Sequence, residues 1–252
     1  MTYVIVLYFC TLYQYQNLSM VDIFNDSDCD NCTDCDIRSP VFGVLTNEEK
    51  YLLNKDRYIV KYKPGELIYK QGSSYTHVIS LTSGLVKLYI EGSQKELITR
   101  ICRPVEFIGG SGMYIDNKHH NSAAAVSNVS VCYIEVNQFK DIVRKNAMFA
   151  EELIKMISTR RLYSFERLGS FMQKQMTGRI AEAILYLSEQ IFQMGKFDMI
   201  LSRQDLANFC GVTKEGLIRT LKEFKEAGLI SLDGTYLEIL DNKTLKKVSL
   251  HG

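Results

Sequence analysis

The sequence lacks the signatures of the common enzyme classes and of an exported or membrane-embedded protein. It contains no Walker phosphate loop, no G-x-G-x-x-G dinucleotide turn, no G-x-S-x-G nucleophile elbow and no H-E-x-x-H zinc pair. No Lys or Arg occurs among the first nineteen residues, and the apolar stretch 4–10 is too short to cross a bilayer. We therefore expect a cytoplasmic protein that is not an enzyme and has no membrane partner, and we assign no role to residues 1–19.

The chain also lacks a strong charge of either sign. Its formal net charge is +1, so binding to nucleic acid would require a local basic patch. One candidate stretch contains Arg160, Arg161, Arg167, Lys174 and Arg179. With 252 residues, 46% of them hydrophobic, the chain is long enough for an ordinary globular protein with two domains.

Three of the seven cysteines form a tight run near the N-terminus. Cys29, Cys32 and Cys35 have C-x2-C-x2-C spacing and lie in an aspartate-rich stretch. Without an export signal the chain is expected to remain in a reducing compartment, where such a run binds metal more often than it forms disulfides. An iron-sulfur cluster, zinc and no metal at all remain alternatives for this run.

Short strands dominate residues 57–134. Apolar and polar residues alternate there in brief runs that are separated by glycines. The segments 63–66 and 82–84 have turn sequences in which Gly65 and Gly84 can adopt positive φ. This pattern predicts an antiparallel roll or sandwich.

Residues 146–176 change to a helical period and predict one long helix. Its apolar residues recur at roughly heptad intervals, which favours packing against the same helix of a second subunit. The predicted dimerisation residues are Phe149, Leu153, Met156, Ile157, Leu168 and Phe171. The alternative is a helix that packs only on its own roll. A further helix is expected from 177 to about 194, ended by Gly195.

Residues 202–224 predict a helix-turn-helix. If Arg203 is the first position of the motif, Ala207 occupies the crowded fifth position, Gly211 the turn and Leu217 the buried fifteenth position. Ser202 is expected to cap the first helix, with Asp205 at the third helical position, and Thr213 is expected to cap the second. These requirements are steric, so the spacing of these residues favours a helix-turn-helix over a chance match.

The outer face of the second predicted helix carries residues that can read base edges. Arg can donate two bonds to guanine and a carboxylate can accept one from cytosine, so Arg219 and Glu215 could read a G·C pair. A solvent-exposed salt bridge between them is the alternative. The full predicted DNA-binding set is Ser202, Arg203, Gln204, Thr213, Lys214, Glu215, Gly216, Arg219 and Lys222. A hairpin over 229–239, with a type I′ turn at Asp233-Gly234, would form the wing.

Taken together, these motifs resemble the Crp/Fnr family of bacterial transcription regulators. The resemblance rests on 63–66, 83–84, 106–109, the long helix, 202–207, and Glu215 with Arg219. It implies an α+β fold with an N-terminal cyclic-nucleotide-binding-type β-roll (a double-stranded jelly roll), a long dimerisation helix and a C-terminal winged helix-turn-helix. The corresponding segments are an N-terminal extension with the cysteine run (1–40), the effector roll (41–145), the dimerisation helix (146–176) and the DNA-binding domain (177–252). It further implies a homodimer, a palindromic site on double-stranded DNA and RNA polymerase as a partner.

The resemblance also bears on the signal to which such a regulator would respond. Cyclic-nucleotide sensors of the family hold the ligand with a Glu and an Arg, which here are replaced by Gly110 and Asn121, so we do not expect cAMP to bind. Oxygen-sensing relatives hold a [4Fe-4S] cluster on three N-terminal cysteines and one in the roll, and 129–134 resembles the context of that fourth ligand. The resemblance therefore implies Cys29, Cys32, Cys35 and Cys132 as cluster ligands, although the family's best-known oxygen sensors have wider cysteine spacing.

Other hypotheses remain. The same DNA-binding regulator could respond to another small ligand, or to a haem or nitrosative signal in the roll, with structural or zinc-binding cysteines. His77, His119 and His120 would then be candidate haem ligands, although a solvated loop is the simpler interpretation of the last two. An iron-sulfur oxidoreductase or a scaffold module without a DNA role would fit the helix-turn-helix spacing poorly.

Overall fold

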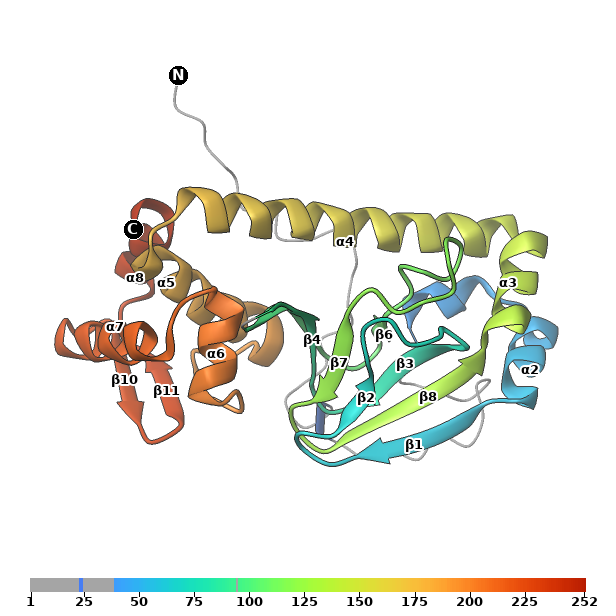
Figure 1. The fold of residues 1–252 in the computed structure, drawn as a ribbon, viewed down its shortest axis with the longest axis horizontal. Coiled ribbons are helices and arrows are strands. Elements are labelled where there is room, and N and C mark those ends of the chain that lie inside the picture. Colours follow the sequence, from blue (N-terminus) through green and yellow to red (C-terminus); the bar gives the residue numbers. More distant parts are fainter. Residues whose placement is uncertain (1–22, 25–38, 94) are drawn as a thin grey trace, which may run out of the picture.

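The computed structural model describes residues 23–24, 39–93 and 95–252. A β-roll and a small C-terminal domain lie below a single long helix, α4 (Ala147–Gln173), which extends along both (Figure 1). The predicted α+β fold is thus confirmed. Cys29, Cys32 and Cys35 lie outside the described residues. Within the described part of the chain, no helix is both long and apolar enough to cross a membrane.

Two four-stranded antiparallel sheets form the roll, with the strand orders β1-β8-β3-β6 and β2-β7-β4-β5. The strands are β1 (Tyr58–Tyr62), β2 (Leu67–Tyr69), β3 (His77–Ser83), β4 (Val86–Glu91), β5 (Glu96–Cys102), β6 (Phe107–Ile108), β7 (Ser122–Ala125) and β8 (Val129–Glu135). Leu81 and Val131 of one sheet pack against Val86 of the other inside the roll. Gly84 makes the predicted turn at φ +81°, where a Cβ would lie 2.0 Å from the Asn128 carbonyl oxygen.

Short helices cover the end of the roll from which α4 departs. They are the 3-10 helix η1 (Pro40–Val44), α2 (Asn47–Lys55) and α3 (Val136–Lys145). Thr46 and Glu49 form a reciprocal capping box at the start of α2, which satisfies two otherwise unpaired backbone N–H groups. Phe42 and Phe139 pack around Phe149 of α4, so this core joins the beginning of the long helix to its own roll.

Helices α5 (Met176–Tyr186) and η2 (Leu187–Phe192, a π-helical turn) follow α4. The helix expected from 177 to about 194 is present, and its buried face contains Ile180, Ile184, Leu187 and Ile191. The predicted end at Gly195 is wrong, because the helix stops at Gln193, which adopts the left-handed conformation at φ 54°.

The C-terminal domain contains α6 (Arg203–Cys210), α7 (Lys214–Glu226), α8 (Asn242–His251) and a three-stranded sheet of order β10-β11-β9. Its strands are β9 (Lys196–Asp198), β10 (Ile230–Asp233) and β11 (Tyr236–Ile239). The predicted wing is present, but the type I′ turn at Asp233-Gly234 is wrong. Asp233 pairs with Tyr236, which makes Gly234-Thr235 the loop, and only Gly234 has the positive φ that type I′ needs at both positions.

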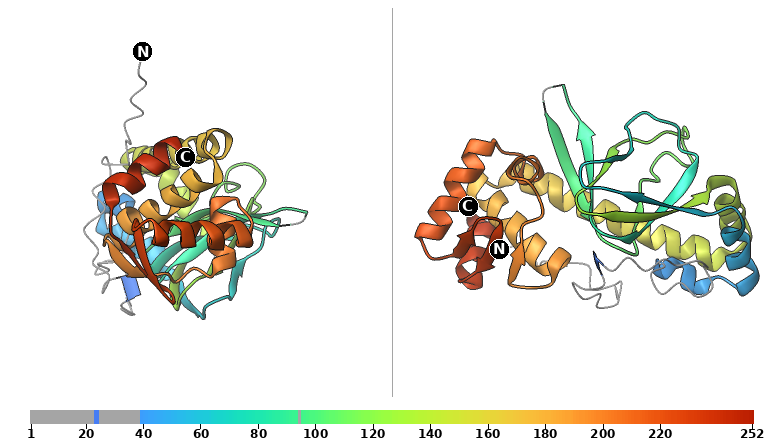
Figure 2. Two further views of the ribbon diagram at one scale, coloured as in Figure 1. Left: turned by 90° about the vertical axis from the view of Figure 1, so that its left-hand side faces the viewer. Right: turned by 90° about the horizontal axis from the view of Figure 1, so that it is seen from below.

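The roll and the C-terminal domain lie side by side along α4 (Figure 2) and share one apolar core. Leu85, Ile98 and Ile101 of the roll pack with Ile180 and Ile184 of α5. Ile23, only 1% exposed, belongs to this core, and its carbonyl oxygen accepts a 2.7 Å hydrogen bond from the Gly84 N–H. Lys87 of β4 donates to Asp205 at the start of α6 over 2.5 Å. The two parts of the molecule are therefore held together by apolar packing and a partly buried ion pair.

Candidate nucleic-acid interface

The helix-turn-helix is built as its spacing predicts. Ser202 Oγ accepts from the Asp205 N–H and Thr213 Oγ1 from the Gly216 N–H, so each cap satisfies a free amide of the first helical turn. Ala207 and Leu217 are completely buried between the two helices. Gly211 ends α6 in the left-handed conformation at φ 64°, the position at which side chains other than glycine are strained.

Helix α7 has a buried face and an exposed face, as predicted. Leu217, Leu221 and Phe224 are buried. Lys214, Glu215, Arg219 and Lys222 are exposed, which brings four of the predicted DNA-binding side chains together on one face. Gly216 is the exception: it is buried, and a Cβ there would lie 2.7 Å from the Met176 sulfur, so it faces α5 and not the outer surface.

Arg219 pairs with Glu223 and not with Glu215, the partner that the alternative interpretation gave it. Arg219 Nε lies 3.9 Å from a Glu223 oxygen, and Lys222 Nζ lies 3.7 Å from one of Glu226. All four side chains are at least half exposed, so these contacts contribute little to folding and can be exchanged for contacts with a ligand. The i, i+4 spacing of the glutamates was the signal in the sequence for these partners.

The wing is attached to both helices of the motif. Arg203 donates to the Gly234 carbonyl oxygen over 2.8 Å, which links the start of α6 to the tip of the wing. Lys225 of α7 donates to the Leu232 carbonyl oxygen over 2.8 Å. Gln204 remains exposed beside Asn208, to which it donates. The start of α6, the outer face of α7 and the wing therefore form one continuous surface with fixed geometry.

Four of the five cations in the basic stretch 160–179 are engaged within the protein, and only Arg161 among them is exposed. Arg160 donates to the Phe107 carbonyl oxygen, Arg179 donates to that of Gly211, and Lys174 pairs with Glu182 over 2.7 Å. Arg167 is 9% exposed. These cations hold the long helix to the rest of the chain, so their proximity in sequence was misleading.

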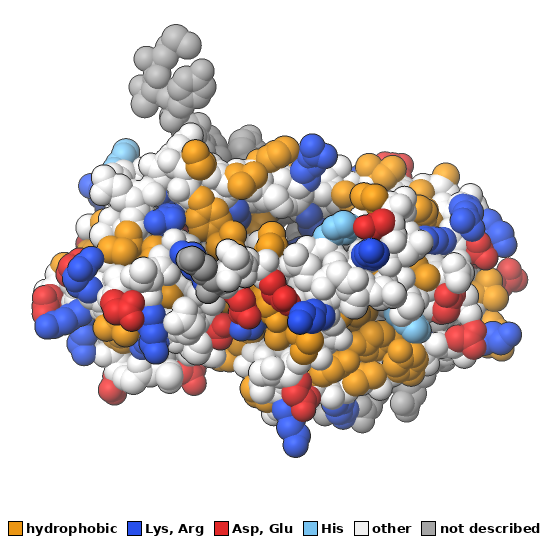
Figure 3. All heavy atoms as spheres, viewed as in Figure 1, with side chains coloured by type: hydrophobic (Ala, Val, Ile, Leu, Met, Phe, Trp, Pro, Cys, Tyr) orange, Lys and Arg blue, Asp and Glu red, His pale blue; other side chains and the backbone are white. Residues whose placement is uncertain are grey.

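Two parallel stripes of side chains run along α4. The inner stripe packs on the protein's own core and contains Phe149, Leu153, Met156, Arg160, Tyr163 and Arg167. The outer stripe contains Ile154, Ile157, Arg161, Phe165, Leu168 and Met172, and its apolar members are 53–85% exposed. Hydrophobic side chains accordingly gather along the upper edge of the molecule, over α4 (Figure 3).

This arrangement corrects part of the predicted dimerisation set. Phe149 and Leu153 are 0% and 6% exposed, so neither is available to a partner helix, and Met156 is partly buried against the same core. Phe171 is half-buried against the Gly211 turn. Ile157 and Leu168 remain exposed. The heptad spacing occurs on both stripes, and the prediction mixed residues of the intramolecular face with residues of the exposed face, because sequence period alone does not say which face meets which partner.

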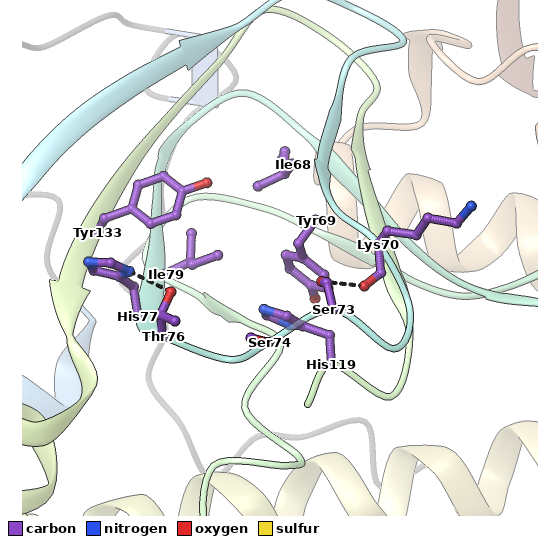
Figure 4. Close-up of a pocket in the computed structure, with 10 residues that line it drawn as sticks. All are labelled: Ile68, Tyr69, Lys70, Ser73, Ser74, Thr76, His77, Ile79, His119 and Tyr133. Atoms are coloured by element: carbon purple, nitrogen blue, oxygen red, sulfur yellow. Dashed lines mark hydrogen bonds between the residues drawn. The ribbon is translucent and has the colours of Figure 1, made fainter. Parts of the chain in front are cut away.

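The roll contains a cavity of about 320 Å³. It is lined by Ile68, Tyr69, Lys70, Ser73, Ser74, Thr76, His77, Ile79, His119 and Tyr133 (Figure 4). Gly110 and Asn121, which replace the family's cyclic-nucleotide ligands, are not part of this lining. None of the described residues that line the cavity is acidic, and the lining contains aromatic rings, hydroxyls, two imidazoles and Lys70.

His119 is not the solvated loop residue that the sequence predicted. It is 6% exposed and its ring stacks on Tyr69 with centroids 3.8 Å apart. Burial lowers the pKa of His119 to about 4, which keeps the imidazole neutral near pH 7. His120, in contrast, is half exposed and pairs with Asp116 over 3.1 Å.

Cys132 lies on the outer side of β8, among side chains of η1 and α2. It packs with Val41, Phe42 and Leu53, and Arg57 Nη1 donates to its sulfur over 3.6 Å. In the described residues, no group of three or more His, Cys, Asp or Glu side chains is placed to hold a metal ion. The predicted partners of Cys132 all precede residue 39.

Comparison with known proteins identifies both parts of the chain. A family described as the Crp-like helix-turn-helix domain matches residues 178–248, and the cyclic nucleotide-binding domain family matches 59–146. The anaerobic regulatory protein of Haemophilus influenzae is 26% identical over 219 residues, covering 84% of each chain. The fumarate and nitrate reduction regulatory protein of Escherichia coli is 26% identical over 230 residues, covering 88% of this chain and 91% of its own.

Comparison with solved structures shows the same fold as in other members of this family. FixK2 from Bradyrhizobium japonicum superposes with a TM-score of 0.70 at 18% identity, over 76% of this chain and 96% of that one. The relatives found by sequence are transcription regulators and not enzymes. The chain is therefore a DNA-binding transcription regulator of the Crp/Fnr family.

Proposed function

We propose that a homodimer of this chain binds a two-fold symmetric DNA site, with one α7 helix in the major groove of each half-site. The observation that carries the proposal is the exposed face of α7, where Glu215 and Arg219 lie one helical turn apart beside a wing. Their carboxylate and guanidinium match the donor and acceptor pattern of a G·C pair. Ser202, Arg203, Gln204, Thr213, Lys214 and Lys222 would contact the DNA backbone, which positions the helix without choosing a sequence.

The outer stripe of α4 supports the dimer. Its exposed apolar side chains have heptad-like spacing over five turns, and pairing two such stripes would remove them from water. A dimer built on this seam would hold its two reading helices about a dyad that matches a palindrome. We propose a cytoplasmic location and RNA polymerase as the partner of the bound dimer.

Selection from a pool of random duplexes tests the proposal. The bound sequences should share two inverted half-sites whose centres are about one helical turn apart. Each half-site should contain a G·C pair in a fixed position. Recovery of sequences without inverted repeats, at an enrichment no greater than that of the starting pool, would contradict the symmetric mode of binding.

For the signal, we propose that the cysteine run and Cys132 hold a [4Fe-4S] cluster that makes DNA binding respond to oxygen. The names of the relatives, an anaerobic regulator and a regulator of fumarate and nitrate reduction, favour this signal. Three features of this chain support the fit. Cys132 faces η1 and α2 and not the inside of the roll, and Arg57 offers a positive charge to a negatively charged cluster. Cys35 precedes Ser39 by only four residues, a span of at most about 14 Å.

The bound cluster would supply a group that oxygen can destroy. The chain's own contribution would be to attach the N-terminal segment to β8 through Cys132, and to orient the cysteine with Arg57. Ile23 lies in the core between the roll and α5. A change near the cysteine run would therefore alter the packing between the roll and the C-terminal domain.

Iron analysis of two matched cysteine variants tests the cluster. Protein purified without oxygen should contain about four iron atoms per chain, and Cys132→Ala should lower iron and acid-labile sulfide to background. Cys102→Ala is the control, since Cys102 is buried inside the roll, and it should keep the iron. Zinc in place of iron in the anaerobic wild type, or full iron content in Cys132→Ala, would contradict the proposed ligand set.

A further inference from the structure

The last two turns of α4 carry two different sets of side chains. Leu168 and Met172 are 59% and 85% exposed and belong to the proposed dimer seam. Arg167 and Phe171 lie on another face of the same turns and contact the C-terminal domain. The two sets share one rigid helical segment, so the position of one fixes the position of the other.

Arg167 holds the end of the first helix of the helix-turn-helix. Its guanidinium lies over two aromatic rings, 4.7 Å from the Phe171 centroid and 4.4 Å from that of Phe209. Its Nη2 donates to the Phe209 carbonyl oxygen, in the last turn of α6. A planar cation that lies over two rings and donates a hydrogen bond to a backbone carbonyl has little rotational freedom.

Phe171 contacts the turn between the two helices. A Cβ on Gly211 would lie 2.8 Å from a Phe171 ring carbon, so the ring rests directly on the turn backbone. Arg179 of α5 donates to the Gly211 carbonyl oxygen over 3.3 Å. Two guanidiniums therefore face the carbonyl end of α6, where positive charge is electrostatically favourable.

We propose that Arg167 is a specificity-determining positioning residue, which sets the spacing of the two half-sites that the dimer accepts. This rests on the proposed function, because it requires a dimer seam on α4 and a reading helix α7. Arg167 and Phe171 fix the angle between the seam and the helix-turn-helix, and in a symmetric dimer that angle appears twice. One base pair more or less between half-sites changes their separation by roughly 3.4 Å and their rotation by roughly 35°. A helix-turn-helix that is held firmly against α4 cannot adjust its position to the new half-site separation, whereas one that is held loosely can.

Binding to duplexes of different spacing tests this role. Arg167→Met keeps a side chain of similar length but removes the charge and the planar group. Its affinity should be measured for the selected palindrome, for palindromes with one base pair inserted or removed at the centre, and for a single half-site. We expect the preference for the original spacing to fall by about tenfold, while half-site affinity changes less than about threefold. Arg144→Met, at an exposed arginine of α3, is the control and should match the wild type.

The outcomes separate the possible roles of Arg167. If the variant keeps the wild-type spacing preference, the inference is wrong. If half-site binding and thermal stability fall together, Arg167 merely supports the fold, and the inference is again wrong. Should Arg167→Met not fold, Phe171→Leu is the second variant. It removes the ring that contacts both Arg167 and the Gly211 turn, and it must relax the spacing preference. A wild-type protein that binds a half-site but shows no spacing preference would refute the inference alone, whereas one that binds no duplex would refute the proposed function as well.

Discussion

Replacement of Arg219 by alanine should weaken binding to the selected palindrome by at least about thirtyfold and remove the preference at one G·C pair in each half-site. A bidentate contact to guanine contributes about 1–3 kcal/mol of discrimination, and a symmetric dimer makes it twice. The side chain is 69% exposed, and its ion pair with Glu223 is long and solvated, so the fold should not change. Fluorescence anisotropy with the palindrome and with a duplex mutated at that pair measures both effects.

Two further variants show whether the loss is one of specificity. Lys222→Ala removes a cation from the same face of α7 and should weaken all duplexes alike, with a shallower salt dependence, as expected for a phosphate contact. Arg144→Ala removes an exposed arginine of α3 and should have no effect. Retention of the wild-type preference for the G·C pair in Arg219→Ala would refute the assignment of Arg219.

Replacement of Leu168 by glutamate should convert the dimer to a monomer at micromolar concentration. Leu168 is 59% exposed on the outer stripe of α4, so the monomer should fold normally, and sedimentation velocity should show one folded species of half the mass. In the dimer, each substitution would remove an apolar contact worth about 1.5–3 kcal/mol and bury a carboxylate at the seam. Affinity for the palindrome should fall by about a hundredfold, because the two half-sites would no longer be bound together.

Ile115→Glu is the matched control for the seam. Ile115 is 80% exposed in the turn between β6 and β7, so this substitution adds the same charge to an apolar residue outside the stripe. It should leave both the mass and the DNA affinity unchanged. If Leu168→Glu remains a dimer, the proposed seam on α4 is wrong and the two α7 helices are held by another interface.

Arg161 gives the seam an unusual chemistry. It lies between Ile157 and Phe165 on the outer stripe, with its guanidinium 5.3 Å from the Phe165 ring centroid. A cation among apolar side chains is costly to bury unless an aromatic face or a counter-charge receives it. The ring of Phe165 offers such a face within the same helix, which lowers the free-energy cost of burying Arg161 at the seam.

The sequence alone determined the features that depend on neighbours a few residues apart. The caps of α6 and α7, the positive φ of Gly211 and the two faces of α7 follow from requirements within one or two helical turns, and all are present. The glycine turns of the roll follow for the same reason. Two predictions of the exact residue at which an element ends were wrong. Gly195 does not end the helix, and Asp233 remains in its strand instead of making the turn.

Only the tertiary structure decided which partner each surface meets. A heptad period identifies an apolar stripe, but the stripe of Phe149 and Leu153 is covered by residues about a hundred positions away in the sequence, including Phe42. Likewise Arg167 and Arg179 look like surface cations until the carbonyl groups at the end of α6 are placed beside them. Burial and charge pairing depend on contacts between distant segments, and the free energy of those contacts cannot be read from local spacing.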